Sequence, residues 1–201
     1  MIEEIENKIN DDLENSSKLR FANLHISEMA ICGYKYRYSY DNKLIIPHRW
    51  LFEIGNAFEY ILFRYIKKVY KNAQSQYEVI YEDNDYKIIG HLDVYINEIK
   101  TVIEIKTSKS NNYTDIYERQ LFAYMVYGAI ENGILLKYNI LNDKLFETKY
   151  HINDIHDSTI ESFGKNITAF KENRYIEGIE NSLCGFCENI NCKMSGKRSV
   201  K

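Results

Sequence analysis

The hydrophobic and polar positions of this chain follow two different periods, and together they predict a mixed α/β fold. Apolar residues recur at the spacing of an amphipathic helix over 2–19, 28–38, 51–69, 115–132 and 153–172. Alternating, β-branched stretches predict strands over 76–81, 87–96, 102–106, 134–140 and 144–150. A helix, three strands, a helix and a strand, flanked by further helices, describe one layered domain.

Charged side chains stand out on two neighbouring predicted strands. In the strand over 87–96 the even-numbered residues are mostly apolar, so Asp93 points to the opposite face. The next strand places Glu104 and Lys106 on one face, because side chains alternate along a strand. Turn residues separate the two strands, and a hairpin there brings Asp93 beside Glu104. The pattern therefore predicts two carboxylates and one ammonium group at a single point.

This combination of groups fits the hydrolysis of phosphodiester bonds. Carboxylate oxygens suit hard cations such as Mg²⁺ or Mn²⁺, which bind few carboxylates and keep several waters. A bound ion would activate water and neutralise phosphate charge, while Lys106 could orient that water or stabilise the transition state. Each acid alone is usually a solvated charge on a strand, so the prediction depends on all three occurring together.

The four cysteines form a second motif. Cys184, Cys187 and Cys192 lie close together late in the chain, and Cys32 lies far from them on the helix predicted over 28–38. Four thiolates complete a tetrahedral Zn²⁺ site or hold a [4Fe-4S] cluster, and either would close the fold as a clasp. Two disulfides are the alternative, which an intracellular location disfavours. The spacing itself does not choose between zinc and iron.

Charge and hydropathy indicate where in the cell the protein is found and what it can bind. The chain has no apolar run long enough to span a bilayer, and its acidic beginning is unlike a secretory signal. We therefore expect a cytoplasmic, intracellular protein without a membrane partner. The formal net charge of -3 excludes binding of nucleic acids through overall positive charge, although a nuclease needs only a local basic groove.

Two further segments carry signals for nucleic-acid binding. Residues 34–40 interleave tyrosines with basic residues, including Lys35 and Arg37, and such a combination stacks unpaired bases and contacts phosphates. The same tyrosines could instead pack around the cysteines. Gln120 and Tyr124 lie one turn apart on one side of a predicted helix. The polar edge of a buried helix would give the same pattern.

Three polar motifs follow one another along the chain: Gly90-x-x-Asp93, Glu104-x-Lys106 and Gln120-x-x-x-Tyr124. In this order they resemble the motifs of RecB-like nucleases in the PD-(D/E)xK superfamily. The resemblance spans roughly residues 27–193 and implies a restriction-endonuclease-like αβββαβ core with flanking helices. It also implies that the Gln-Tyr motif meets the DNA backbone or positions the catalytic lysine.

The same resemblance assigns roles at the predicted metal site. It implies that Glu59, Asp93, Glu104 and the carbonyl of Ile105 bind Mg²⁺ or Mn²⁺, and that Asp93 and Glu104 act with Lys106 in catalysis. Glu59 stands where motif I of the family usually has a histidine. A carboxylate is also a suitable ligand for a hard cation, so this departure is compatible with an active site.

One cysteine before motif I and three after the Gln-Tyr motif resemble the iron–sulfur clasp of certain RecB-like nucleases. These include the CRISPR-associated single-strand exonuclease family, its free-standing viral relatives and the AddB-type helicase–nuclease subunits. The resemblance therefore favours a [4Fe-4S] cluster over zinc. It predicts that the ligands are Cys32, Cys184, Cys187 and Cys192.

The expected protein is a metal-dependent deoxyribonuclease that acts on single-stranded DNA or on DNA ends. We expect one nuclease domain over 1–201, made of a helical extension (1–26), a nuclease core (27–180) and a cysteine loop with a basic tail (181–201). Two alternatives are a nuclease fold that binds DNA without cutting it, and a subunit of a CRISPR spacer-acquisition complex. Integrase or recombination proteins would then be its partners.

Overall fold

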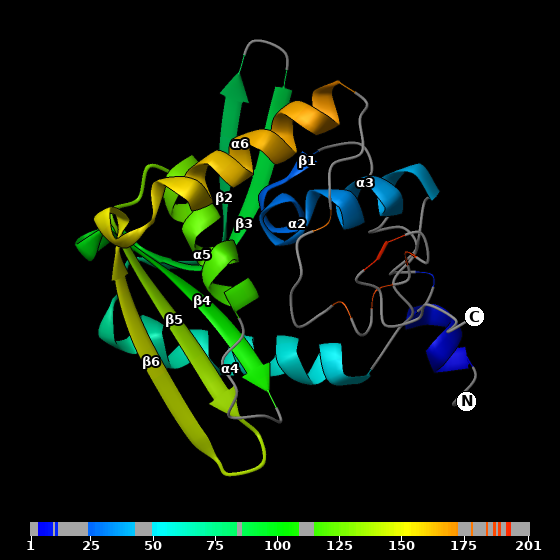
Figure 1. Cartoon of the computed structure of the whole chain (residues 1–201). Helices are drawn as coiled ribbons and strands as arrows, with labels where there is room; N and C mark the ends of the chain where they lie inside the picture. The colour runs from blue at the N-terminus through cyan, green and yellow to red at the C-terminus, as the bar shows by residue number, and fades with distance from the viewer. Residues whose placement is uncertain are drawn as a thin grey trace.

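The fold is that of a computed structural model, shown in Figure 1. The structure describes residues 4–9, 11, 24–42, 50–83, 86–108, 115–172, 178, 184, 187, 189, 192 and 193. Its elements are β1 (Leu24–His25), α2 (Ile26–Ile31), α3 (Gly33–Asn42), α4 (Trp50–Val69), β2 (Ala73–Asp83), β3 (Tyr86–Ile96), β4 (Thr101–Ser108), α5 (Asp115–Tyr127), β5 (Asn132–Asn139), β6 (Lys144–His151) and α6 (Asp157–Lys171).

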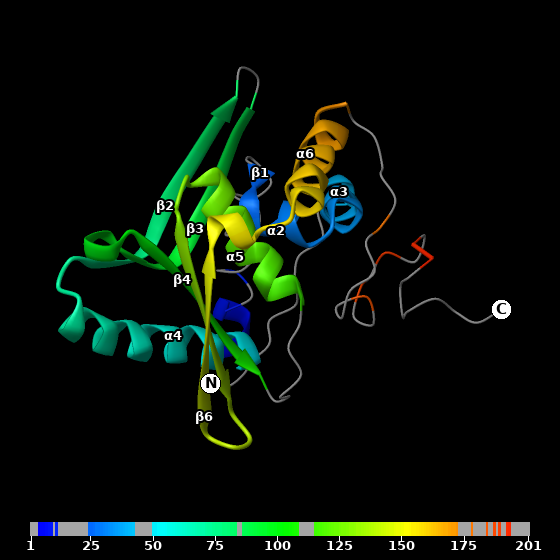
Figure 2. The ribbon, with the colours of Figure 1, turned by 60° about the vertical axis from the view of Figure 1, so that its left-hand side comes forward.

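One six-stranded sheet runs through the molecule in the order β1-β3-β4-β5-β6, with β2 paired to β3. Neighbouring strands β2–β3, β3–β4 and β5–β6 are antiparallel, whereas β4 and β5 are parallel because α5 carries the chain back between them. Figure 2 shows the β2–β3 hairpin extending away from the β5–β6 hairpin. The predicted α/β class and αβββαβ order are confirmed by α4, β2, β3, β4, α5 and β5.

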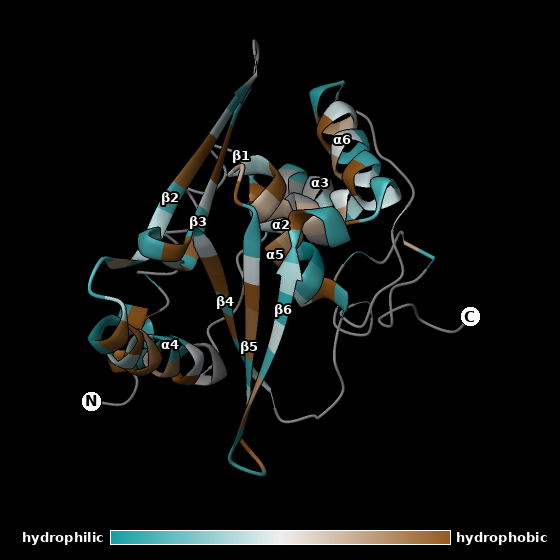
Figure 3. Cartoon of the chain, turned by 90° about the vertical axis from the view of Figure 1, so that its left-hand side faces the viewer, coloured by the Kyte–Doolittle hydropathy of each residue, from teal (hydrophilic) through white to brown (hydrophobic). Residues whose placement is uncertain are grey.

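Helices cover both faces of this sheet (Figure 3), and each face has its own hydrophobic core. On one face Val102 and Leu135 pack with α2, α5 and α6. On the other face Ile103 and Ile105 of the same strand β4 pack against α4. The alternation of these β4 residues between two cores is what a central strand buried on both sides requires.

Part-way along the β2–β3 hairpin, the side chains of each strand turn from one hydrophobic core to the other. Leu92 belongs to the core on the α5 side, but Val94, two residues later, belongs to the core on the α4 side. On β2, Val79 and Ala73 are divided in the same way. A regular strand would keep each pair on one face. The sequence predicted that the even-numbered residues of β3 form one apolar face, and this is wrong, because Ile88 and Leu92 pack in one core and Val94 and Ile96 in the other.

Several helix boundaries differ from the prediction. Cys32 does not lie within one continuous helix, because α2 ends at Ile31 and α3 begins at Gly33. Helix α5 ends at Tyr127 and not near residue 132, since Ala129 adopts the left-handed conformation with φ 50°. The amides of Ala129 and Ile130 then donate to Val126 and Met125, as in a Schellman cap. Alanine at that position is uncommon, so the sequence did not reveal the end of the helix.

The ends of the chain are described in part. Residues 4–9 are helical, and most of the remaining predicted helix over 2–19 lies outside the described residues. Helix α6 begins at Asp157 and not at 153, because residues 152–154 form a short 3₁₀ turn capped by His151. Within the part of the chain that the structure describes, no helix has the length and apolar character needed to cross a membrane.

Candidate active site

A fork in the sheet creates the site. β3 and β4 are paired at Ile96↔Thr101, Tyr95↔Val102 and Val94↔Ile103, and there the ladder stops. One edge of β3 pairs with β2 along its whole length. The other edge pairs with β4 at one end of β3 and with β1 at the other end, at Ile88 and Ile89. Asp93 lies at the point where β4 departs.

The Asp93 side chain accepts the hydrogen bond of a β4 amide that has no backbone partner on β3 beyond the end of the ladder. Its Oδ2 accepts a hydrogen bond of 2.7 Å from the backbone N–H of Ile105. A carboxylate that accepts from a buried amide is held in one orientation, which fixes Asp93 opposite Glu104 on the next strand. Burial raises the pKa of Asp93 despite the opposing effects of Lys106 and this hydrogen bond.

Glu104 lies at the centre of β4 and is fully buried, with 0% of its surface exposed. It forms an ion pair with Lys106, and among the described residues neither carboxylate oxygen has a well-directed hydrogen-bond donor. Burial, followed by the nearby charge of Asp93, raises the pKa of Glu104 to about 8. A buried acid left in this condition is energetically costly unless a cation joins it.

Lys106 provides the positive charge of the site. Its side chain is 22% exposed, so its ammonium group pairs with Glu104 while remaining partly open to solvent. Burial alone would lower the pKa of Lys106, but the charges of Glu104 and Asp93 outweigh that effect and raise it. The ammonium also lies 5.7 Å from the centroid of the Tyr117 ring, on α5. The predicted group of Asp93, Glu104 and Lys106 is therefore brought together by the fold.

Glu59 reaches the same place from α4, which covers the other face of the sheet. Burial, and then the charge of Asp93, raise the pKa of Glu59, while Gln76 and Lys106 act to lower it. The side-chain amide of Gln76 donates a hydrogen bond of 2.7 Å to Glu59 Oε1. Glu59 is thus the fourth charged group at the fork, at the position where the sequence motif predicted it.

Gln76 is the site residue that the sequence did not reveal. It lies on β2 across from Asp93, between the paired residues Ser75 and Tyr77, and has φ 51°. This left-handed conformation costs a non-glycine residue roughly 1–2 kcal/mol and breaks the regular alternation of the strand. The same residue marks the change of face of the hairpin. Glutamine in a polar strand segment carries no sequence signal for such a conformation.

Gln120 and Tyr124 line the α5 side of the site. The Gln120 amide lies 3.3 Å from the Tyr124 hydroxyl, as one-turn spacing predicts. Tyr124 is only 3% exposed, and burial, followed by the charge of Glu104, raises its pKa above its usual range. A Cβ added to Gly90 would lie 2.8 Å from both Tyr124 Cε1 and Ile26 Cδ1. The glycine of the predicted motif therefore makes room for the tyrosine.

The other predicted DNA-binding residues are placed only in part. Lys35 lies in α3 with its side chain half-buried, whereas the side chain of Arg37 lies outside the described residues. Tyr34, from the same aromatic and basic segment, is in contact distance of Gly178, because a Cβ on that glycine would lie 3.4 Å from the Tyr34 ring. The role of this segment in DNA binding stays a prediction.

The structure describes all four cysteines, and none of them forms a disulfide in it. Cys192 Sγ lies against Gly178 and hence near Tyr34, at the start of α3. Cys32 lies close enough to Arg119 that, together with Asp115, it opposes the lowering of that residue's pKa by burial. Cys192 thus lies near the start of α3, which begins one residue after Cys32, although among the described residues the four thiols are not gathered as ligands of one cluster.

Within the described ranges, no three His, Cys, Asp or Glu side chains enclose a space that could already hold a metal ion. At the fork, the Lys106 ammonium pairs with Glu104 and also acts on Asp93. The donor set nevertheless fits a hard divalent cation, because it consists of carboxylate oxygens, two of which lack hydrogen-bond donors.

No protein-family model matches this chain, and no curated protein matches it in sequence. Solved structures do match its fold. The crystal structure of SSO0001 matches with a TM-score of 0.65 at 21% sequence identity, covering 90% of this chain and 93% of that chain. The alkaline exonuclease LHK-Exo from Laribacter hongkongensis matches with a TM-score of 0.57 at 13% identity, covering 78% of this chain and 89% of that chain.

The structure of LHK-Exo in complex with dAMP matches equally well, with a TM-score of 0.57. At these low identities the similarity establishes the fold. This chain has a nuclease fold of the kind found in that exonuclease. The motifs identified in the sequence and the fork described here lie within this fold.

Proposed function

We propose that this chain is a metal-dependent nuclease that hydrolyses phosphodiester bonds in DNA. The observation that carries the proposal is the fully buried Glu104, which lies beside Asp93 and, among the described residues, pairs with the Lys106 ammonium. A structural ion pair would satisfy one carboxyl group, but this site holds two and receives a third from Glu59. Three acidic side chains gathered at one point give a divalent cation the oxygen ligands that it needs, and the cation takes the place of their protons.

The residues that would hold Mg²⁺ or Mn²⁺ are Glu59, Asp93, Glu104 and the carbonyl of Ile105. All four offer oxygen, the ligand atom that both ions prefer. A divalent ion bound by them supplies Lewis-acid activation of water and neutralises charge on the phosphate.

The side chains of the site have separate tasks in this reaction. Lys106 is ion-paired with Glu104, so it stays protonated and donates hydrogen bonds to the attacking water or to the phosphate. The hydrogen bond from Ile105 holds the Asp93 carboxylate in place, and that from Gln76 holds Glu59. Tyr124 is buried and lies near Lys106 on the α5 side, while its partner Gln120 is half-buried and remains the residue of this pair that can contact the DNA backbone.

We further propose that the four cysteines hold a [4Fe-4S] cluster that fastens the late loop to the start of α3. The approach of Cys192 to Tyr34 through Gly178 supports this arrangement. The Cys187 amide donates a hydrogen bond of 3.1 Å to the Cys184 carbonyl. This bond holds the two cysteines near each other, as ligation of one cluster needs.

Cleavage assays test the nuclease proposal. Single-stranded and duplex DNA labelled at either end, and a circular single strand, are incubated with Mg²⁺, with Mn²⁺ or with a chelator. We expect metal-dependent cleavage that Glu104→Gln or Asp93→Asn abolishes, a loss of at least about a thousandfold. The circular substrate shows whether ends are needed, and the two labels show the polarity.

His91→Gln is the matched control, because His91 precedes Asp93 by two residues on β3 and its exposed imidazole lies 3.6 Å from the Glu78 carboxylate, away from the site. We expect this variant to keep full activity. Undiminished cleavage by both carboxylate variants would refute the site. Metal-independent DNA binding without cleavage would instead identify a nuclease fold that has kept only a binding function.

A further inference from the structure

A pocket of about 370 Å³ opens beside the fork, between α4 and β2. Its volume lies within the range of pockets that take a small organic ligand. It touches the candidate active site directly, because Glu59 forms part of its wall. The lining residues are Asn56, Glu59, Tyr60, Phe63, Ser75 and Gln76.

The chemistry of the wall is that of a nucleoside site. Tyr60 presents an aromatic ring that is 64% exposed, and Phe63 offers a second, half-buried ring below it on the same helix. Asn56, Ser75 and Gln76 add amide and hydroxyl groups that can donate and accept hydrogen bonds. Aromatic faces stack on any nucleobase, and amide groups pair with base edges or sugar hydroxyls.

One residue of the pocket wall, Gln76, has an unusual backbone conformation. Gln76 keeps φ 51° within a strand, and that conformation directs its amide to Glu59 and into the pocket wall. Strain of this kind persists where the surrounding structure imposes it, and it concentrates at functional sites. The pocket and the carboxylate site are therefore built around one shared pair, Glu59 and Gln76.

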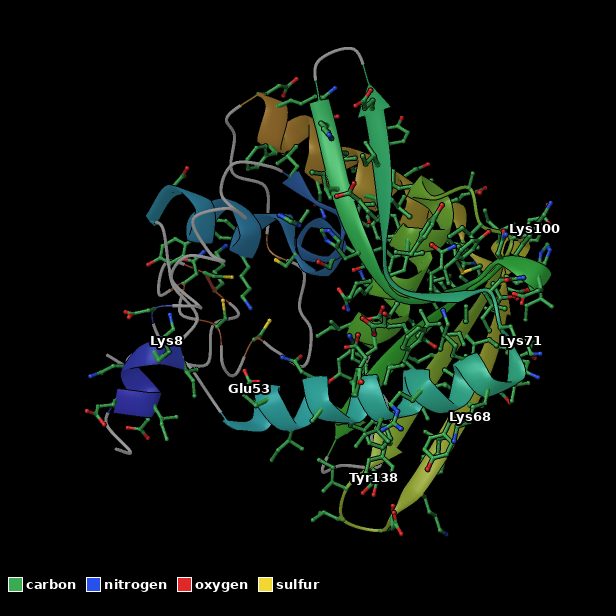
Figure 4. All side chains as sticks on the ribbon, turned by 180° about the vertical axis from the view of Figure 1, so that it is seen from behind. Lys8, Glu53, Lys68, Lys71, Lys100 and Tyr138 are labelled. Carbon is green, nitrogen blue, oxygen red and sulfur yellow. The ribbon has the colours of Figure 1, made fainter. Side chains whose placement is uncertain are left out.

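Positive charge lies along the continuation of α4. In Figure 4, Lys68 and Lys71 stand at the C-terminal end of that helix, on the same side of the molecule as Lys100. The two segments are joined by a hydrogen bond of 2.9 Å from the Asn72 amide to Glu98. A strand leaving the pocket along α4 would meet these ammonium groups, which pair with phosphates.

We propose that this pocket receives the base of the nucleotide next to the cleaved phosphate, stacked on Tyr60. The inference rests on the proposed nuclease function and deepens it by naming the substrate class. A base can enter a protein pocket only when it is neither paired nor stacked within a duplex. The substrate is therefore a nucleic-acid strand that is unpaired at the cleavage site, either a single strand or a frayed end.

Equilibrium binding of single-stranded oligonucleotides tests the pocket without relying on cleavage. The fluorescent base 2-aminopurine is placed at successive positions of the strand, and binding is followed without divalent cation. We expect quenching at one position only, and Tyr60→Ala should remove it and raise Kd about tenfold. Tyr60→Trp should restore both, because stacking needs an aromatic face.

Ile61→Ala is the matched control. Ile61 follows Tyr60 on the same helix and is 49% exposed, but it does not line the pocket. A second measurement separates recognition of the base from a structural role of Tyr60. An abasic nucleotide at the quenched position should weaken binding to the natural protein and leave Tyr60→Ala unaffected, since the base and the ring form one contact.

The outcomes distinguish the inference from the function on which it rests. Equal Kd values for the Tyr60→Ala and Ile61→Ala variants, with metal-dependent cleavage intact, would overturn the pocket and leave the nuclease proposal unaffected. Quenching that is evenly spread over all positions would also overturn it. If the protein binds as expected but never cleaves, the proposed function fails while the pocket remains as a binding site for unpaired nucleotides.

Discussion

At the fork between β3 and β4, charged side chains from separate elements interact with one another. Of the cysteines, the structure shows that Cys192 lies near the start of α3. Glu104 and Lys106 are ion-paired, and Asp93 is held by a backbone amide. At the other end, Cys192 approaches Tyr34 through Gly178. Both regions were predicted from the sequence as ligand sites, and the folded chain supports them unequally.

The physical reason lies in what burial demands of each group. An ionised carboxylate in the interior needs a cation or hydrogen-bond donors, so a vacant ligand position leaves a visible imbalance. A neutral thiol behaves as a small apolar group with a weak donor, and it is buried at little cost with or without a ligand. A carboxylate metal site without its ion can therefore be recognised from the uncompensated charge of its ligands, whereas a cysteine site can be recognised only from the positions of the thiols.

The largest expected effect comes from breaking the cysteine site. Cys184→Ala should strip the cluster and lower the free energy of unfolding by roughly 5 kcal/mol, because ligand binding to the folded state alone becomes folding free energy. Metal analysis, visible absorbance and thermal unfolding measure the change. A colourless, zinc-loaded protein would replace the iron–sulfur proposal with a zinc clasp. A protein with neither metal, and unchanged by the substitution, would leave the fork as the only ligand site of the two.

The next effect is a dependence of stability on pH at the fork. The pKa of Glu104 is about 8 in the folded chain against an ordinary value of 4.5. Between these values the unfolded chain has lost a proton that the folded chain retains. Its contribution to stability is therefore complete below pH 4.5 and is lost as pH rises toward 8. We expect a decline of a few kcal/mol in the metal-free protein, at about 1.4 kcal/mol for each unit between the two pKa values.

Denaturant unfolding of metal-free protein across this pH range measures the slope. Glu104→Gln should remove most of it, and Glu78→Gln, an exposed acid on β2, should leave it intact. Added Mg²⁺ should oppose the decline, because it binds the deprotonated carboxylate. If the slope of the natural protein equals that of Glu104→Gln, Glu104 is not the strained group that its burial indicates.

A smaller effect tests the packing around Tyr124. Gly90→Ala places a methyl group 2.8 Å from Tyr124 Cε1 and from Ile26 Cδ1, so one of them must move. We expect a loss of about 1–3 kcal/mol in unfolding free energy, with reduced cleavage as the tyrosine shifts. Gly164→Ala is the matched control, since nothing lies within 4 Å of its added carbon. This change within α6 should raise stability by about 0.5–1 kcal/mol.

The smallest effect comes from shortening the side chain of Gln76 while keeping its left-handed backbone conformation. Asparagine tolerates the left-handed conformation, but its side chain is one methylene shorter and cannot support Glu59 in the same way. Gln76→Asn should keep the fold and weaken Mg²⁺ or Mn²⁺ binding about tenfold. Calorimetric titration with each ion measures the affinity. Unaltered affinity would show that Glu59 needs no help from β2.

Much of the site could be predicted because its residues lie on elements with strong local patterns. Alternation along β3 and β4 placed Asp93, Glu104 and Lys106 toward one point, and the structure brings these three together. One-turn spacing on α5 placed Gln120 beside Tyr124, and their hydrogen bond agrees. Each of these inferences used a period of two or of about four residues, which the backbone geometry imposes.

The sequence by itself determined the order of helices and strands and the placing of Asp93, Glu104 and Lys106 toward one point. Only the tertiary structure decided that β4 leaves β3 at Asp93, that Gln76 adopts a left-handed conformation and that Cys32 separates two helices. The first set follows from side-chain periodicity within one segment. The second depends on which distant segments compete for the same strand edge or core, and no local pattern encodes that competition.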